Sequence, residues 1–285
     1  MAQILKGKPV ALAINERNLE TIQKLKEKGI IPTLALFRVG ERDDDLSYER
    51  SILKKAEKLG IKVKQYVFDI DVEEKTFYDR LDEANKDENI HAILVFRPLP
   101  KKRFDDETLR NRIDPYKDID GCSDLSLAAI FTKKSFGFAP CTAQAVIEML
   151  DHYELPIEGK NVVVIGRSLV IGKPVSMLLL NRNATVTICH TRTKDIKEIT
   201  KKADILVCAI GNGEMIDASY VSEGQIVIDV GITWSEAKQK LCGDVLYEQV
   251  EPLVGCITPV PGGVGSITTS ILLGNVVKAC EKLSG

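Results

Sequence analysis

The strongest constraint on the fold is a β-branched run that leads into a glycine turn and then a helix. Residues 162–165 are typical of a buried parallel strand, and Gly166, Gly172 and Pro174 precede an apolar stretch at 175–180. A strand–glycine–helix turn directs backbone N–H groups toward a phosphate. The spacing is not G-x-G-x-x-G, so the turn alone fits a phosphate site and an ordinary α/β turn equally well.

The next predicted strand favours a dinucleotide site. Residues 184–189 form that strand, and His190, Thr191 and Arg192 follow it. In a doubly wound fold this position meets the adenosine ribose, where an acid favours NAD and an arginine accommodates the extra phosphate of NADP. No acid stands there, and Arg167 and Arg192 are both available. The sequence therefore predicts NADP.

Two further strands, at 204–210 and 225–230, also end in small or polar residues, at 211–213 and 229–232. Ligands of open α/β sheets bind beyond the carboxyl ends of the strands. Four successive ends of this kind favour a groove for a long ligand over packing alone.

The N-terminal half alternates strands and helices, which indicates a second parallel sheet in its own domain. Ser47 is expected to cap one helix, which ends at Gly60. The expected strands are 33–39, 61–68 and 91–96, and the expected helices are 10–28, 47–59, 72–84, 142–152 and 268–283.

Bulk properties exclude several classes of protein. The net charge is −2, without a basic stripe, which argues against nucleic-acid binding. No apolar run approaches the roughly 20 residues that span a bilayer, and no signal-peptide core is present, so we expect no membrane association and a cytoplasmic location. The seven cysteines form no C-x-x-C pair and the three histidines stand alone. We expect buried free thiols and no metal.

A series of motifs follows in order along nearly the whole chain. They are Val39-Gly40 with Tyr48, Pro98-Leu-Pro100, Lys117-Asp-Ile-Asp-Gly121, Pro140-Cys-Thr142, residues 164–168 with Gly172-x-Pro174, residues 228–232, Gly243-Asp-Val245, and Thr258-Pro-Val-Pro-Gly-Gly-Val-Gly265. This set, and the last motif above all, resembles the methylenetetrahydrofolate dehydrogenase/methenyltetrahydrofolate cyclohydrolase family.

The resemblance implies two α/β domains. A folate-binding catalytic domain would comprise residues 1–140 and 268–285, because the C-terminal helix returns to it, and an NADP-binding Rossmann-type domain would comprise residues 141–267. It also implies a cleft that holds folate and nicotinamide together, and a homodimer.

The resemblance further implies roles for single residues. Tyr48 would pack on the folate and Asp120 would bind the polar edge of the pterin, and these two are the candidate catalytic residues. Taken alone, they fit a core aromatic and a turn former better. Pro261, Gly262 and Gly263 would line the substrate site. The candidate cofactor residues are Gly166, Arg167, Ser168, Gly172, Pro174, His190, Thr191, Arg192 and Ile232.

The chain departs from the family pattern on the substrate side. Ile52 stands where the family has the lysine of the cyclohydrolase step, and Phe96 replaces the glutamine that positions it. Asp45 replaces a serine in the nearby loop. Smaller departures are Ala143 and Ser266, each where the family has a proline.

These departures separate the two activities. Hydride transfer from the methylene carbon needs proximity and orientation, whereas hydrolysis of the methenyl product needs proton transfer that Ile52 cannot perform. We expect an NADP-dependent 5,10-methylenetetrahydrofolate dehydrogenase in one-carbon metabolism, with cyclohydrolase activity lost or weak. The alternatives are a bifunctional enzyme in which Lys55 or water performs the hydrolysis, a silent folate- or NADP-binding protein, and a dehydrogenase with a changed substrate. Arg97 offers charge but no transferable proton.

Overall fold

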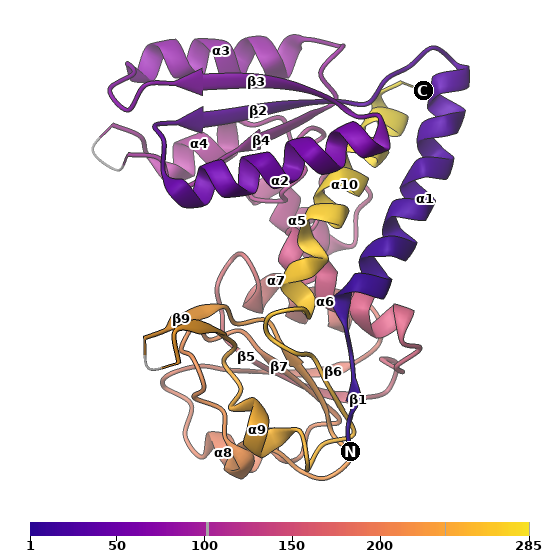
Figure 1. Ribbon diagram of the computed structural model, residues 1–285, viewed down its shortest axis with the longest axis vertical. Coiled ribbons are helices and arrows are strands. Elements are labelled where there is room, and N and C mark those ends of the chain that lie inside the picture. Colours follow the sequence, from indigo (N-terminus) through magenta and orange to yellow (C-terminus); the bar gives the residue numbers. More distant parts are fainter. Residues whose placement is uncertain (101–102, 237, 285) are drawn as a thin grey trace. The chain divides into compact units, whose positions relative to one another are not determined.

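The computed structural model describes residues 1–100, 103–236 and 238–284 and divides the chain into two compact units (Figure 1). The three-stranded unit comprises Ala13–Cys141 and Thr269–Gly285, and the six-stranded unit comprises Met1–Leu12 and Thr142–Thr268. The sequence prediction placed residues 1–12 in the other domain. They group with the six-stranded unit because β1 (Gln3–Ile4) pairs in parallel with β11 (Cys256–Ile257).

The three-stranded unit is built on a parallel sheet of order β3-β2-β4. Its helices α3 and α2 lie on opposite sides of this sheet (Figure 1), and Phe37, Phe77 and Leu81 belong to the core on the α3 side. The strands are β2 (Thr33–Val39), β3 (Lys62–Phe68) and β4 (Ala92–Val95). The helices are α1 (Gly7–Glu27), α2 (Asp43–Leu59), α3 (Glu74–Lys86), α4 (Asp106–Arg112), α5 (Asp124–Thr132) and α10 (Thr268–Leu283), of which α1 and α10 cross a unit boundary. Helix α6 (Cys141–His152) begins at the boundary and belongs to the six-stranded unit from Thr142 onward.

Helix α2 begins four residues earlier than the sequence indicates. Ser47 was expected to cap it, and this prediction was wrong, because the helix starts at Asp43 and its N-cap is Arg42. Three aspartates occupy the first turn, where the positive end of the helix dipole stabilises them. The predicted C-terminus is confirmed: Gly60 adopts φ 76° and its N–H bonds back to the last turn.

The six-stranded unit contains a parallel sheet of order β1-β11-β8-β7-β5-β6. The four strands expected from the sequence are confirmed as β5 (Asn161–Ile165), β6 (Thr185–Cys189), β7 (Ile205–Cys208) and β8 (Ile226–Asp229). All these strands run in the same direction. Strand β5 lies between β6 and β7, so the strands of this sheet that follow β6 are added on the opposite side of β5. The remaining elements are α7 (Gly172–Leu180), α8 (Ile196–Thr200), α9 (Tyr247–Val250), the hairpin β9 (Thr233–Ser235) and β10 (Lys240–Cys242), and the 3₁₀ turns Ala218–Tyr220 and Val264–Ser266.

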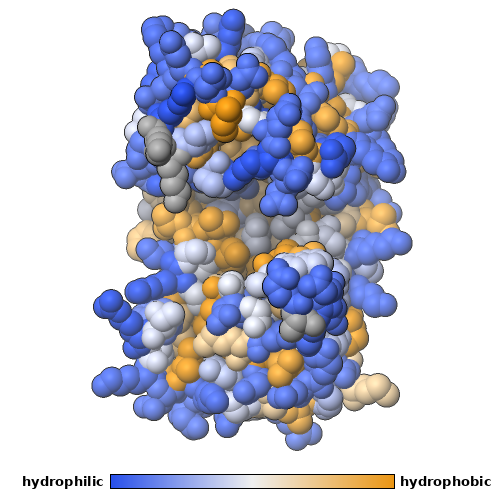
Figure 2. Space-filling view, turned by 60° about the vertical axis from the view of Figure 1, so that its left-hand side comes forward, coloured by the Kyte–Doolittle hydropathy of each residue, from blue (hydrophilic) through white to orange (hydrophobic). Residues whose placement is uncertain are grey.

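The face shown in Figure 2 is largely hydrophilic and carries separate hydrophobic patches. Within the described part of the chain, no helix combines the length and the apolar character that crossing a membrane requires.

Candidate functional site

The turn after β5 is a place where backbone segments approach so closely that only glycine fits. Gly166 adopts φ 128°, and a Cβ atom there would lie 2.2 Å from the carbonyl oxygen of Ala209. A Cβ atom on Gly172 would lie 2.3 Å from the carbonyl oxygen of Gly166. The start of α7 therefore sits directly against the end of β5, which is the arrangement that presents a helix N-terminus to a phosphate.

Ser168 organises the loop between these glycines. Its hydroxyl accepts a hydrogen bond from the N–H of Ile171 at 3.1 Å, and its carbonyl accepts one from the N–H of Lys173 at 3.1 Å. Pro174 is buried in the first turn of α7, while the side chain of Arg167 stays exposed. The loop thus has a fixed backbone and a solvent-facing cation.

A second tight turn follows β6. The N–H of His190 donates to Thr193 Oγ1 at 2.9 Å, and His190 Nδ1 accepts from the N–H of Arg192 at 3.2 Å. Thr191 and Arg192 are exposed. Within the described residues, neither Arg167 nor Arg192 forms an ion pair, so both guanidiniums are available to an anionic ligand at this edge of the sheet.

The same edge contains a cavity of about 270 Å³. It brings together Ile232, which follows β8, and the segment Pro261, Gly262 and Gly263, which follows β11. Ile232 is 57% exposed, and Gly262 adopts φ 103°. The candidate cofactor residues therefore lie at the carboxyl ends of β5, β6 and β8, and the candidate substrate-lining residues Pro261, Gly262 and Gly263 follow β11 and share a cavity with Ile232.

Two buried carboxylates that sequence reasoning missed support this edge. Asp244 accepts the N–H groups of Ile210 (2.6 Å), Gly211 (3.1 Å) and Asn212 (2.9 Å). Asp229 accepts those of Gly231, Asp244 and Val245, each at 3.0 Å. Burial raises the pKa of Asp229 to about 7, against the effect of these N–H bonds. The available signal was the pair of neighbouring glycines, Gly231 and Gly243.

In the three-stranded unit, Tyr48 lies near Phe96, one of the positions where the sequence suggested a departure from the family pattern. Its ring is 5.7 Å from that of Phe96, with an interplanar angle of 33°. Ile52, one turn further along α2, is 0% exposed, and Phe96 is 5% exposed, whereas Tyr48 is 37% exposed. Burial, followed by the nearby Cys141 and Asp120, raises the pKa of the Tyr48 hydroxyl well above its ordinary value. Tyr48 therefore offers a neutral, partly exposed aromatic ring next to the buried apolar side chains of Phe96 and Ile52.

Three residues of the Lys117–Gly121 motif have distinct structural roles. The Lys117 ammonium donates to the carbonyls of three residues at the end of α3, which are Ala84, Asn85 and Asp87. Asp118 is 1% exposed and accepts the N–H groups of Cys122 and Ser123 and the hydroxyl of Ser126. Gly121 adopts φ 63°, and a Cβ atom there would lie 2.4 Å from the carbonyl oxygen of Phe138. These contacts fix the backbone on both sides of Asp120.

Asp120 differs from Asp118 because, within the described part of this motif, no hydrogen bond occupies its carboxylate. Burial raises its pKa to about 6, while Arg97 lowers it and Asp118 raises it. Arg97 Nη2 donates to Asp120 Oδ2 at 3.5 Å. Asp120 and Tyr48 are close enough that the carboxylate raises the pKa of the phenol. An aromatic face and an acceptor carboxylate in one place suit a flat heterocycle with an N–H edge.

A buried ion pair holds α2 against the end of β2. Arg38 Nε lies 2.6 Å from Glu49 Oε2, and both side chains are less than 10% exposed. Arg38 also donates to the carbonyl of Gly40, and Gln65 donates to the other oxygen of Glu49. Because Glu49 is the neighbour of Tyr48, this network sets the place of the tyrosine. Among the described residues, no group of three or more His, Cys, Asp or Glu side chains forms a metal cluster.

Comparison with known proteins covers nearly the whole chain. Residues 5–120 match the model of the tetrahydrofolate dehydrogenase/cyclohydrolase catalytic domain, and residues 140–284 match that of its NAD(P)-binding domain. The bifunctional protein FolD of Clostridium botulinum (strain Langeland) is 50% identical over 284 residues, which is 100% of both chains.

Solved structures agree in fold. The bifunctional enzyme FolD from Campylobacter jejuni, a methylenetetrahydrofolate dehydrogenase/cyclohydrolase, matches with a TM-score of 0.94 and 37% identity over 99% of each chain. The Trypanosoma brucei enzyme, solved with NADP cofactor and inhibitor, matches with a TM-score of 0.90 and 33% identity over 99% of this chain and 98% of that one.

Proposed function

The chain belongs to the tetrahydrofolate dehydrogenase/cyclohydrolase family, and we propose that it oxidises 5,10-methylenetetrahydrofolate to 5,10-methenyltetrahydrofolate with NADP. The observation that carries the proposal is the proximity of Tyr48 to the Asp120 carboxylate in one unit, together with intact glycine turns in the other.

The residues of the six-stranded unit fit NADP. The turn after β5 leaves no room for a Cβ atom at Gly166 or Gly172, as a backbone phosphate cradle requires. The end of β6 carries Arg192 and no acid, which suits a 2′-phosphate. NADP supplies a hydride acceptor when bound. Gly166 and Ser168 would hold its pyrophosphate, Arg167 and Arg192 its 2′-phosphate, and Ile232 would pack along it.

The three-stranded unit would orient the folate. Tyr48 offers an aromatic face for the pterin, and the Asp120 carboxylate would accept hydrogen bonds from the N–H edge of the ring. Pro261, Gly262 and Gly263, from the six-stranded unit, would line the substrate. This chain needs no acid–base group for the hydride step, because the methylene carbon gives up its hydride once it is held in line with the acceptor.

Loss of the hydrolytic step is the second part of the proposal. The side chain of Ile52 is fully buried and that of Phe96 nearly so, and neither carries a proton that it could transfer to or from water. An apolar floor beneath Tyr48 also disfavours an ordered nucleophilic water, since a water needs two to four polar partners.

A bifunctional enzyme is the second candidate, and two observations favour it. The Clostridium botulinum and Campylobacter jejuni relatives are named as bifunctional. Lys55 lies one turn beyond Ile52 on α2, and burial lowers its pKa, which moves an ammonium group toward the range of a general acid or base. Hydrolysis that disappears in Lys55→Met would favour this candidate.

The proposed oxidation is tested by the absorbance of the methenyl product. We expect it to rise with methylenetetrahydrofolate and NADP. The kcat/KM should be at least about tenfold higher for NADP than for NAD, because Arg167 and Arg192 form no ion pair within the described residues and no acid directly follows β6. A higher kcat/KM for NAD would overturn the cofactor assignment. Tight folate binding without turnover would indicate a silent binding protein, and no folate binding would indicate another substrate.

Location and assembly follow the family resemblance. Seven free cysteines agree with a reducing compartment such as the cytoplasm. A homodimer is expected, and light scattering measures it directly.

A further inference from the structure

The substrate side of this chain carries a cation next to Asp120. We propose that Arg97 is a positioning residue that keeps Asp120 in its carboxylate form and aims it at the N–H edge of the pterin. This inference rests on the proposed function, because it takes the ligand of Asp120 to be a folate. It extends that function by assigning a role to a residue next to Phe96, one of the substituted positions.

Both the guanidinium and the backbone carbonyl of Arg97 have polar partners. Its guanidinium lies between two carboxylates, with Nη2 3.5 Å from Asp120 Oδ2 and Nη1 3.6 Å from Asp106 Oδ1. Its side chain is 22% exposed. Its backbone carbonyl accepts a hydrogen bond from Arg42 Nη2 at 3.1 Å, and Arg42 is bound by both oxygens of Asp45 at 2.8 Å. Asp45, another departure from the family pattern, therefore supports the same arginine.

The other groups around Asp120 cannot replace this cation. Asp118, two residues earlier, adds negative charge, and its oxygens are already bound by Cys122, Ser123 and Ser126. Cys141, at the start of α6, and Tyr48, on α2, are neutral because burial raises the pKa of each. A hydrogen bond with Cys141 lowers the pKa of Asp120, but less than the charge of Arg97 does. Burial alone drives Asp120 toward its protonated form. Arg97 opposes that change, so its loss favours a protonated acid that accepts fewer hydrogen bonds from the pterin.

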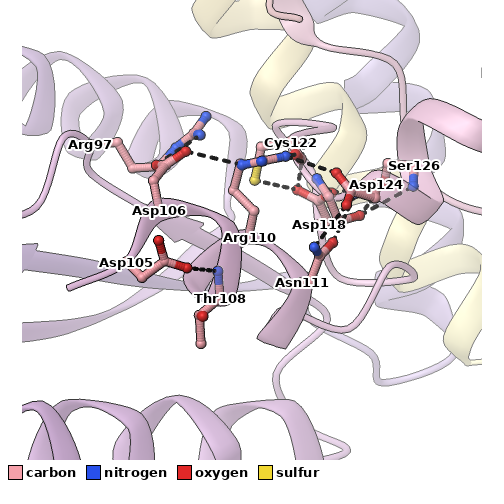
Figure 3. A network of polar contacts seen from close by, with 11 residues as sticks. Arg97, Asp105, Asp106, Thr108, Arg110, Asn111, Asp118, Cys122, Asp124 and Ser126 are labelled. Atoms are coloured by element: carbon pink, nitrogen blue, oxygen red, sulfur yellow. Dashed lines mark hydrogen bonds and ion pairs between the residues drawn. The ribbon is translucent and has the colours of Figure 1, made fainter.

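The ion pairs of Arg97 extend through Asp106 to Arg110, and Arg110 serves as a matched control. Asp106, which pairs with Arg97, also lies 3.0 Å from Arg110, and Arg110 lies 3.0 Å from Asp124 (Figure 3). Arg110 thus belongs to the same network and shares a partner with Arg97, but it has no contact with Asp120.

The chemistry of arginine fits a site that has lost hydrolysis. A guanidinium stays protonated at every pH that the protein experiences, so it supplies a fixed charge and does not exchange protons. A lysine at position 52 could supply both a charge and a transferable proton. With Ile52 and Arg97, the chain keeps a positive charge for Asp120 but has no proton carrier at position 52.

The test is the pH dependence of tetrahydrofolate binding, measured by calorimetry under anaerobic conditions from pH 5.5 to 9. In the unsubstituted chain, affinity is expected to be constant at high pH and to fall as the pH drops through about 6, where Asp120 becomes protonated. In Arg97→Gln the midpoint is expected to rise by about one pH unit. The drop in affinity between high pH and pH 5.5 is then expected to be nearly tenfold larger in Arg97→Gln than in the unsubstituted chain.

Three more variants make the result decisive. Arg97→Met, which keeps the apolar stem without the charge, should shift the midpoint as Arg97→Gln does, while Arg97→Lys and the control Arg110→Gln should leave it near its original value. If Arg97→Gln and Arg97→Met have the same midpoint as the unsubstituted chain, the role assigned to Arg97 is wrong, and the proposed function is unaffected. No tetrahydrofolate binding by the unsubstituted chain at any pH overturns the proposed function as well.

Discussion

Replacing Gly166 with alanine is expected to weaken NADP binding by about 100-fold and to lower the free energy of unfolding by about 3 kcal/mol. The new Cβ atom would lie 2.2 Å from the carbonyl oxygen of Ala209, and φ 128° is unfavourable for any residue with a side chain. Backbone cannot rotate away as a side chain can. The β5 turn must therefore move, and its N–H groups leave the place where the pyrophosphate binds.

Gly224→Ala is the matched control for this substitution. Gly224 also has a positive φ, of 77°, but its Cβ position has no atom within 4 Å. Its replacement is expected to cost about 1 kcal/mol and to leave NADP binding unchanged. Calorimetric titration with NADP and chemical unfolding measure both effects. NADP affinity in Gly166→Ala within threefold of the unsubstituted chain would contradict the assignment of this turn.

Replacing Asp244 with asparagine is expected to cost about 3 kcal/mol of unfolding free energy and to weaken NADP binding. Asp244 is 0% exposed and accepts three consecutive backbone N–H groups, from Ile210, Gly211 and Asn212. An asparagine has one acceptor oxygen, and its NH₂ group would face N–H donors. The turn after β7 would lose the carboxylate that holds it at the proposed cofactor edge.

Asp204→Asn provides the comparison, because Asp204 also accepts a backbone N–H group, that of Asn161 at 2.7 Å, but at a partly exposed position. Water can satisfy the N–H group there, so the expected cost is below about 1 kcal/mol. Equal stability of the two variants in denaturant titrations, with NADP binding intact in both, would show that Asp244 does not hold the cofactor edge.

The sequence predicted what short-range patterns control. The β-branched runs of β5, β7 and β8 and the glycine that ends α2 were found within a few residues, because side-chain period and backbone freedom are local properties. Ser47 was chosen as a cap by its residue type, but the three aspartates before it interact with the helix dipole and extend α2. Strands β1 and β11 have two residues each and carry no periodic signal.

Long-range partners were beyond the reach of sequence reasoning. Asp229 and Asp244 are 15 residues apart, and their role depends on backbone turns that come together only in the folded sheet. The Arg97–Asp120 contact spans 23 residues and two loops. The sequence identified both residues as candidates of interest, but only the packing of the loops shows that they face one another.

The positions where the sequence suggested departures from the family pattern are connected within the three-stranded unit. Phe96 packs on Tyr48, Ile52 is fully buried on the same helix as Tyr48, and Asp45 binds Arg42, which donates to the backbone carbonyl of Arg97.

The most direct test of this account is the fate of methenyltetrahydrofolate when it is supplied to the purified protein. The account predicts that methenyl-folate forms from methylenetetrahydrofolate and NADP, while supplied methenyl-folate disappears no faster than in a blank without enzyme. Hydrolysis clearly above the blank would contradict the account, because it would show that another group performs the proton transfers that Ile52 cannot.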